Sequence, residues 1–165
     1  AQSILITDSA TFADNVAEAI ERQLKVLPRS SIARKSWEAQ GGIIVVSALE
    51  DAASLVDRIA PEHLELAISD PDVFASKIRH AGAIFLGRYT PEAIGDYVAG
   101  PNHVLPTSRS ARLSSGLGIL DFMKRTTLVT CDAESLRRIG PAAVLLAEAE
   151  GLDAHALSVS IRLND

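Results

Sequence analysis

The chain has 165 residues, of which 47% are hydrophobic and 22% are charged, and its formal net charge is −5. This composition excludes an intrinsically disordered chain, and a transmembrane protein is excluded because no apolar run approaches the ~18 residues that span a bilayer. The 16 Lys and Arg residues against 21 Asp and Glu argue against a broad nucleic-acid-binding face. We expect a soluble, cytoplasmic protein, because the single Cys131 cannot form an internal disulfide and the N-terminus lacks the features of a signal peptide.

Short apolar segments alternate with amphipathic segments over the first half of the chain. The β-branched run at residues 43–46 is typical of a strand buried on both faces, and Pro28 and Pro61 mark the ends of helices. Short links rich in Gly, Pro and Asp are typical of a parallel α/β sheet. The pattern therefore predicts strands at 3–7, 43–46, 64–68 and 83–86, and helices at 12–24, 30–39, 49–59 and 71–78.

The character of the chain changes after Gly87. Residues 88–118 are rich in Gly, Pro, Ser, Thr and Asn, with only a helical turn near 91–97. So long a connection inside a compact domain is usually functional or poorly ordered. A further strand is predicted at residues 123–130.

The C-terminal segment is predicted to be helical. Asp132 is a suitable N-cap for a helix that Gly151 ends, and Pro141 within it should kink or interrupt it. A final apolar segment begins at Asp153. Because the helix has an apolar face, we expect this tail to pack on a partner chain. The predicted fold is a three-layer α/β domain with an incomplete Rossmann-like, mainly parallel sheet at residues 1–131, followed by a helical C-terminal tail at 132–165.

Glu62 and His63 lie at the mouth of the predicted strand 64–68. An adjacent carboxylate and imidazole can divide acid–base work, because one can activate a water molecule while the other carries the proton. The alternative interpretation is a solvated Glu and a surface His at the start of a strand.

Two further pairs of polar residues are candidates for a site. Asp96 can serve as a hard oxygen ligand for a divalent metal, and His103 as a metal ligand or a hydrogen-bonding group for substrate. The alternative is an Asp near a helix end and an ordinary loop His. Glu150 and His155 are separated by Gly151, and their spacing does not suit a metal-binding pair on one helix turn, so the spacing favours a solvated pair.

Other sequence signatures of catalysis and cofactor binding are missing. The segment Gly116-Leu117-Gly118 lacks the third glycine and the preceding strand of a dinucleotide-binding motif. The sequence has neither a phosphate-binding Gly-Lys loop nor a Gly-x-Ser-x-Gly turn. We therefore assign no cofactor-binding residue in this chain.

Three blocks of the sequence closely resemble histidinol dehydrogenase. They are RIAPEHLE at 58–65, AGAIFLG at 81–87 and TPEAIGDYVAGPNHVLPT at 90–107, and the resemblance continues through 121–125 and 150–155. Enzymes of this family use Zn²⁺ and NAD to oxidise L-histidinol to L-histidine through histidinaldehyde, in the last steps of histidine biosynthesis. The resemblance implies an NAD-dependent oxidoreductase of this kind, with L-histidinol as its small-molecule substrate.

The resemblance also implies roles for individual residues. Glu62 would activate the water that attacks the aldehyde, and His63 would be the acid–base group for both oxidations. Asp96 and His155 would be zinc ligands. The implied substrate-binding residues are His63, Asp96, His103, Glu150 and His155.

The resemblance places this chain in the C-terminal portion of the family's longer chain. The N-terminal portion would supply most of the NAD site and two further zinc ligands, so the chain alone is expected to bind zinc weakly and to be inactive. The family's homodimer, in which the C-terminal tail crosses to the partner, implies the same arrangement here, with an N-terminal half chain as a further partner. The alternatives are a non-catalytic binding or scaffold module with the same fold, an unrelated α/β regulatory domain, and a relative that oxidises another amino or sulfonated alcohol.

Overall fold

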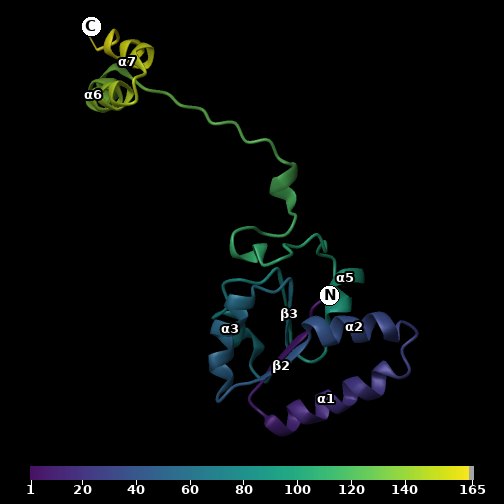
Figure 1. Ribbon diagram of the computed structural model, residues 1–165. Helices are drawn as coiled ribbons and strands as arrows, with labels where there is room; N and C mark the ends of the chain where they lie inside the picture. The colour runs from purple at the N-terminus through teal and green to yellow at the C-terminus, as the bar shows by residue number, and fades with distance from the viewer. Residues whose placement is uncertain (164–165) are drawn as a thin grey trace. The chain divides into compact units, whose positions relative to one another are not determined.

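Four short strands and the helices that connect them build the first part of the chain (Figure 1). The structure, a computed structural model, describes residues 1–163, and the chain forms two compact units whose boundary in the sequence lies between Phe122 and Met123. The elements of the first unit are β1 (Ile4–Thr7), α1 (Ala10–Leu24), α2 (Ser30–Gln40), β2 (Gly42–Val45), α3 (Ala52–Ile59), β3 (His63–Leu66), α4 (Pro71–Ala75), β4 (Ala83–Leu86) and α5 (Glu92–Tyr97), with 3-10 turns at Leu49–Asp51, Ser110–Arg112 and Ile119–Phe122.

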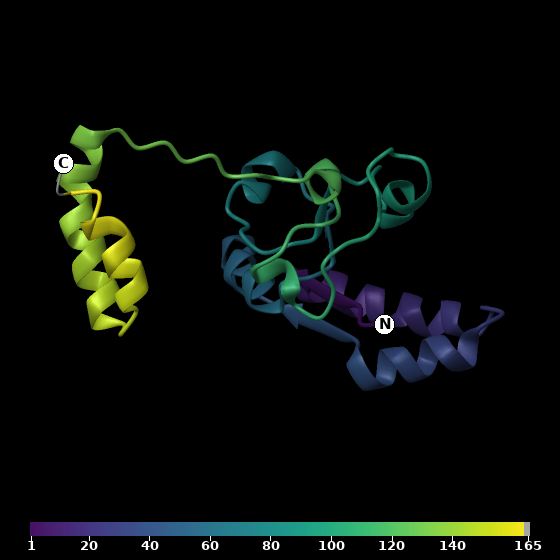
Figure 2. The ribbon, with the colours of Figure 1, turned by 90° about the horizontal axis from the view of Figure 1, so that it is seen from above.

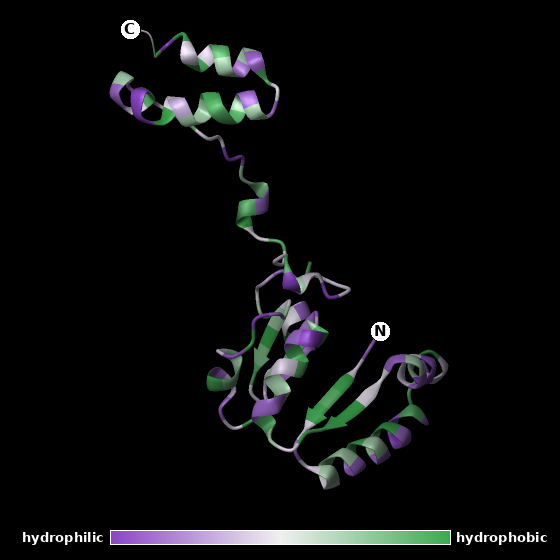
Figure 3. Ribbon diagram, turned by 60° about the vertical axis from the view of Figure 1, so that its left-hand side comes forward, coloured by the Kyte–Doolittle hydropathy of each residue, from purple (hydrophilic) through white to green (hydrophobic). Residues whose placement is uncertain are grey.

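The strands pair in parallel, as predicted. β1 pairs with β2, with Ile4 opposite Gly42, and β3 pairs with β4, with His63 opposite Ala83. The predicted α/β fold class is confirmed, and all four strands lie within two residues of their predicted bounds. Hydrogen bonding divides them into two two-stranded sheets in place of one continuous sheet. Figure 3 shows that the strands are predominantly hydrophobic, which explains why their apolar runs were recognisable.

The core of the first unit lies where α3, β3 and α4 meet. Ala52, Leu66 and Phe74 are buried there, with exposed fractions of 2%, 5% and 7%. Leu66 is the last residue of β3, so the core holds that end of the strand and His63 lies at the opposite end, near α5. Partly buried side chains that pack around this core are Ile6, Leu49, Ala53, Leu64, Ile68, Ala75 and Ile78.

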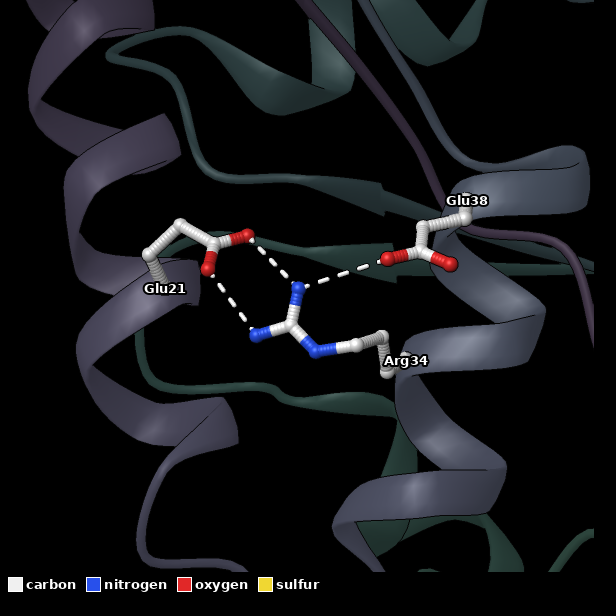
Figure 4. Close-up of polar contacts among 3 residues, drawn as sticks. All are labelled: Glu21, Arg34 and Glu38. Carbon is white, nitrogen blue, oxygen red and sulfur yellow. Dashed lines mark hydrogen bonds and ion pairs between the residues drawn. The ribbon is translucent and has the colours of Figure 1, made fainter.

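Helices α1 and α2 lie side by side and are joined by a surface ion-pair cluster (Figures 2 and 4). Arg34 on α2 donates hydrogen bonds of 3.3 and 2.9 Å to the two carboxylate oxygens of Glu21 on α1, and one of 3.4 Å to Glu38 on its own helix. The hydrogen bond from Arg34 lowers the pKa of Glu21, and the same contact raises the pKa of Arg34. Because all three side chains are solvated, this cluster orients the two helices but contributes little to stability.

In the described part of the second unit, α6 (Ala133–Ala149) packs against α7 (Asp153–Ser160). Ala147 on α6 and Ala156 on α7 are buried. Gly151 has a φ of +71°, a left-handed conformation that suits glycine at the end of α6. The predicted helical C-terminal segment is therefore confirmed. Within the described residues 1–163, none of the helices combines the length and apolar character needed to span a lipid bilayer.

The strand predicted at residues 123–130 was wrong. These residues form no strand, and Leu128 and Val129 are 90% and 86% exposed, because their favourable side chains find no neighbouring strand within the described part of the chain.

Of the two effects expected from Pro141, a kink or an interruption, the interruption does not occur, because α6 continues through Pro141. A proline usually disfavours helical conformation in the preceding residue by clashing with its Cβ, and here that residue is Gly140, which has none.

The N-cap of α6 makes its first turn sensitive to pH. The Asp132 carboxylate accepts a 2.7 Å hydrogen bond from the Ser135 amide, and this bond lowers the pKa of Asp132. The stabilisation is complete above the unfolded-state pKa of about 3.9 and is lost as the pH falls through the lower folded-state pKa. We expect the hydrogen-exchange protection factor of the Ser135 amide, measured by NMR, to fall in wild type over this acidic range. In Asp132→Ala it should be low already at neutral pH.

The neighbouring first-turn residue Glu134 supplies the control for this measurement. Glu134→Ala should retain the wild-type protection of Ser135, because its carboxylate does not cap the helix. Equal protection of Ser135 in Asp132→Ala and wild type would contradict the capping role.

Candidate functional site

His63 is the first residue of β3, and its side chain is half-buried. The ring centroids of His63 and Phe85 are 5.9 Å apart with an interplanar angle of 37°. The His63 Nε2 atom is buried and has no hydrogen-bond partner among the described residues. Buried polar atoms are nearly always hydrogen-bonded, so the missing partner singles out His63 as a candidate site residue.

Helix α5 brings two carboxylates to His63. Glu92 and Asp96 are four residues apart, so they lie on the same face of the helix. The Nε2 atom of His63 is 3.7 Å from Glu92 Oε1 and 3.6 Å from Asp96 Oδ1. His103, in the loop after α5, places its Nδ1 atom 3.7 Å from the same Asp96 oxygen. The backbone amide of Glu92 donates a 2.7 Å hydrogen bond to Glu65 Oε1, which anchors the start of α5 to β3.

Gly95 permits α5 to approach the strands. A Cβ atom at this position would lie 2.3 Å from Cε1 of Phe85, well inside van der Waals contact. Phe85 is itself buried in β4. The absence of a side chain at Gly95 therefore allows the helix to carry Glu92 and Asp96 to His63.

The two carboxylates of α5 perturb each other. A hydrogen bond with Asp96 raises the pKa of Glu92, and burial and the negative charge of Asp96 act in the same direction, while His63 opposes them. A positive charge placed between them, either a metal ion or a protonated imidazole, would relieve this repulsion.

The cluster fits a divalent metal ion. His63, Glu92 and Asp96 each offer one ligand atom, and these atoms all lie within 4.8 Å of one another. One imidazole and two carboxylates form a donor set suited to Zn²⁺ and to similar ions. The site can therefore combine a metal ligand with an acid–base group.

The structure brings together three of the predicted site residues: His63, Asp96 and His103. Glu62 is half-buried just before β3, where its carbonyl oxygen accepts a 2.9 Å hydrogen bond from the Ala83 amide. Among residues 1–163, no hydrogen bond or ion pair joins the Glu62 carboxylate to His63. Two predicted residues belong to the second unit and are exposed there: Glu150 follows α6, and His155 lies in α7.

Glu92 was missed by the sequence analysis. Its signal was available, because Glu92 and Asp96 have the one-turn spacing of a helix and a helical turn was predicted near 91–97. The spacing alone does not place Glu92 near His63; that requires the packing of α5 against β3.

Comparisons with known proteins identify the family. Residues 1–163 match the family "Histidinol dehydrogenase". The chain is 68% identical over 165 residues to histidinol dehydrogenase from Rhodospirillum rubrum, and 63% identical over 163 residues to that from Gluconobacter oxydans. Each match covers 99% of this chain and 38% of the relative, so the chain spans about 38% of the length of these curated relatives.

A solved structure agrees with the sequence comparison. The crystal structure of histidinol dehydrogenase from Elizabethkingia anophelis matches with a TM-score of 0.82 and 39% identity, over 98% of this chain and 37% of that one. Both the fold and the sequence therefore point to the same relatives. The chain belongs to the histidinol dehydrogenase family.

Proposed function

We propose that the chain is the C-terminal portion of a histidinol dehydrogenase, which oxidises L-histidinol to L-histidine through histidinaldehyde with zinc and NAD. The observation that carries this proposal is the buried His63 Nε2 atom, which lies within 4 Å of two carboxylates in a chain of this family. An imidazole in that setting is suited to accept the proton of an alcohol, because nearby carboxylates stabilise the resulting positive charge.

The proposed roles follow the resemblance and the geometry of the first unit. His63 accepts the proton in both oxidations, and Glu62 activates the water that adds to the aldehyde carbon. Asp96 and His155 hold zinc, while His103 and Glu150 hold the substrate. The metal would supply Lewis acidity at the substrate oxygen, and NAD would accept the hydride.

We further propose a cytoplasmic homodimer that acts without nucleic acid or membrane. Residues 1–131 form its Rossmann-like domain, and the tail at 132–165 crosses to the partner subunit. Asp96 and His155 provide two zinc ligands, fewer than a structural or catalytic zinc site requires from protein. The 165-residue chain alone should therefore bind zinc weakly and show no dehydrogenase activity.

A chimera tests this proposal. In it, the present chain replaces the matching 38% of the Rhodospirillum rubrum enzyme, to which it is 68% identical. We expect the chimera to form NADH from L-histidinol in the presence of zinc, and the isolated chain to form none. A folded, zinc-loaded chimera without activity would instead support a non-catalytic module. Activity of the isolated chain would contradict its dependence on the remaining portion.

A further inference from the structure

The Asp96 carboxylate lies close to two histidine side chains and is also a proposed metal ligand. Its Oδ1 atom lies 3.6 Å from His63 Nε2 and 3.7 Å from His103 Nδ1, and in the proposed function Asp96 is also a zinc ligand. Coordination of a cation withdraws negative charge from a carboxylate and fixes its orientation. An Asp96 engaged in this way cannot also be the main charge partner of His63.

Glu92 is the other carboxylate within reach of His63. Its Oε1 atom lies 3.7 Å from His63 Nε2, and its side chain is 38% exposed, against 23% for Asp96. The hydrogen bond from its backbone amide to Glu65 Oε1 fixes the position of Glu92 relative to β3, the strand that carries His63. Both partners of the Glu92–His63 pair are therefore held by the same strand.

We propose that Glu92 is the positioning residue of His63. Its carboxylate faces Nε2, so the ring proton of the neutral imidazole lies on Nε2 and Nδ1 is the nitrogen that accepts a proton. The negative charge of Glu92 then offsets the positive charge that the ring gains. This inference rests on the proposed function, because it assigns Asp96 to the metal and His63 to proton transfer. A carboxylate that orients a histidine in this way acts through the histidine and does not touch the substrate.

The competing role for Glu92 is that of a metal ligand together with His63 and Asp96. Coordination through Nε2 would use the lone pair of that atom, so Nε2 could not carry the ring proton that faces Glu92. The two roles make opposite predictions for metal content, since removal of a ligand lowers zinc binding and removal of a positioning residue does not.

The kinetic test uses the chimera with Glu92→Gln, which keeps the size of the side chain and removes its charge. We expect kcat for L-histidinol to fall about 10- to 100-fold, with KM and zinc content unchanged. The solvent deuterium isotope effect on kcat should rise, because proton transfer to His63 becomes slower than the other steps. The matched control is Glu50→Gln, an exposed glutamate in a 3-10 turn outside the site, which should leave all four quantities unchanged.

A structural test is independent of activity. In the 165-residue chain, nuclear Overhauser contacts between the ring protons of His63 and Phe85 report the orientation of the imidazole, since the ring centroids are 5.9 Å apart. We expect these contacts to weaken in Glu92→Ala and to persist in Glu50→Ala, with the remaining spectrum unchanged in both.

The outcomes separate this inference from the proposed function. Wild-type kcat in Glu92→Gln, zinc lost in step with activity, or unchanged His63–Phe85 contacts in Glu92→Ala would each overturn the positioning role. An unsubstituted chimera without activity would count against the proposed function, and the ring contacts would then decide the role of Glu92 on their own.

Discussion

Replacing His63 by asparagine in the chimera should lower kcat for L-histidinol oxidation by about 10²- to 10⁴-fold, the range typical of a lost general base. Asparagine fills part of the space of the imidazole but cannot accept a proton near neutral pH. The zinc content should stay at the wild-type level, because the proposed ligands Asp96 and His155 are untouched. Steady-state kinetics and metal analysis of the same preparation measure both quantities.

A second histidine of the first unit supplies the control for this substitution. His80 is half-buried, and its backbone amide donates a 3.0 Å hydrogen bond to Asp57, outside the cluster around His63. His80→Asn should therefore leave kcat unchanged. A kcat within a few-fold of wild type in His63→Asn would remove His63 from the proton-transfer steps.

The largest effect on stability is expected from Gly82→Ala. A Cβ atom at Gly82 would lie 2.5 Å from the carbonyl oxygen of Glu62 and 3.2 Å from Cδ of Pro106. The carbonyl cannot move freely, because it accepts the 2.9 Å hydrogen bond from the Ala83 amide that begins the pairing of β3 with β4. The strands must separate locally, which should lower the free energy of unfolding by about 1–3 kcal/mol.

The fluorescence of Trp37 provides the measurement for Gly82→Ala. Trp37 is the one tryptophan of the sequence and lies on α2, so urea denaturation followed by this signal reports the first unit. The matched control is Gly42→Ala in β2, where an added Cβ meets nothing within 4 Å. The urea concentration at the midpoint of unfolding should be unchanged or slightly higher in Gly42→Ala than in wild type. An unchanged midpoint in Gly82→Ala would show that the backbone at Glu62 adjusts at little cost.

The secondary structure was predictable wherever burial follows sequence pattern. The run Ile43–Val46 and the segment Ala83–Leu86 are apolar enough to identify β2 and β4, and Asp132 marked the start of α6. The strand expected at 123–130 failed for a physical reason: β propensity describes the fit of a side chain to a sheet, and no sheet is present at that point of the described chain.

The site was predictable in part. His63, Asp96 and His103 were proposed from residue type and resemblance, and the structure brings them together. Glu92 required knowledge of tertiary packing, because its contact with His63 depends on Gly95 letting α5 approach Phe85. The roles of all the predicted site residues, Glu62, Glu150 and His155 included, remain predictions that rest on the resemblance.

Strand β3 links the core to the site over only four residues, since it begins at His63 and ends at the buried Leu66. Because the strand is so short, a displacement of Leu66 should also displace His63. An activity screen of the chimera should therefore recover core positions such as Phe74 alongside the site residues. For each such variant, the amount of folded protein and the turnover per folded molecule must both be measured. Loss of activity alone does not distinguish a packing defect from a chemical one.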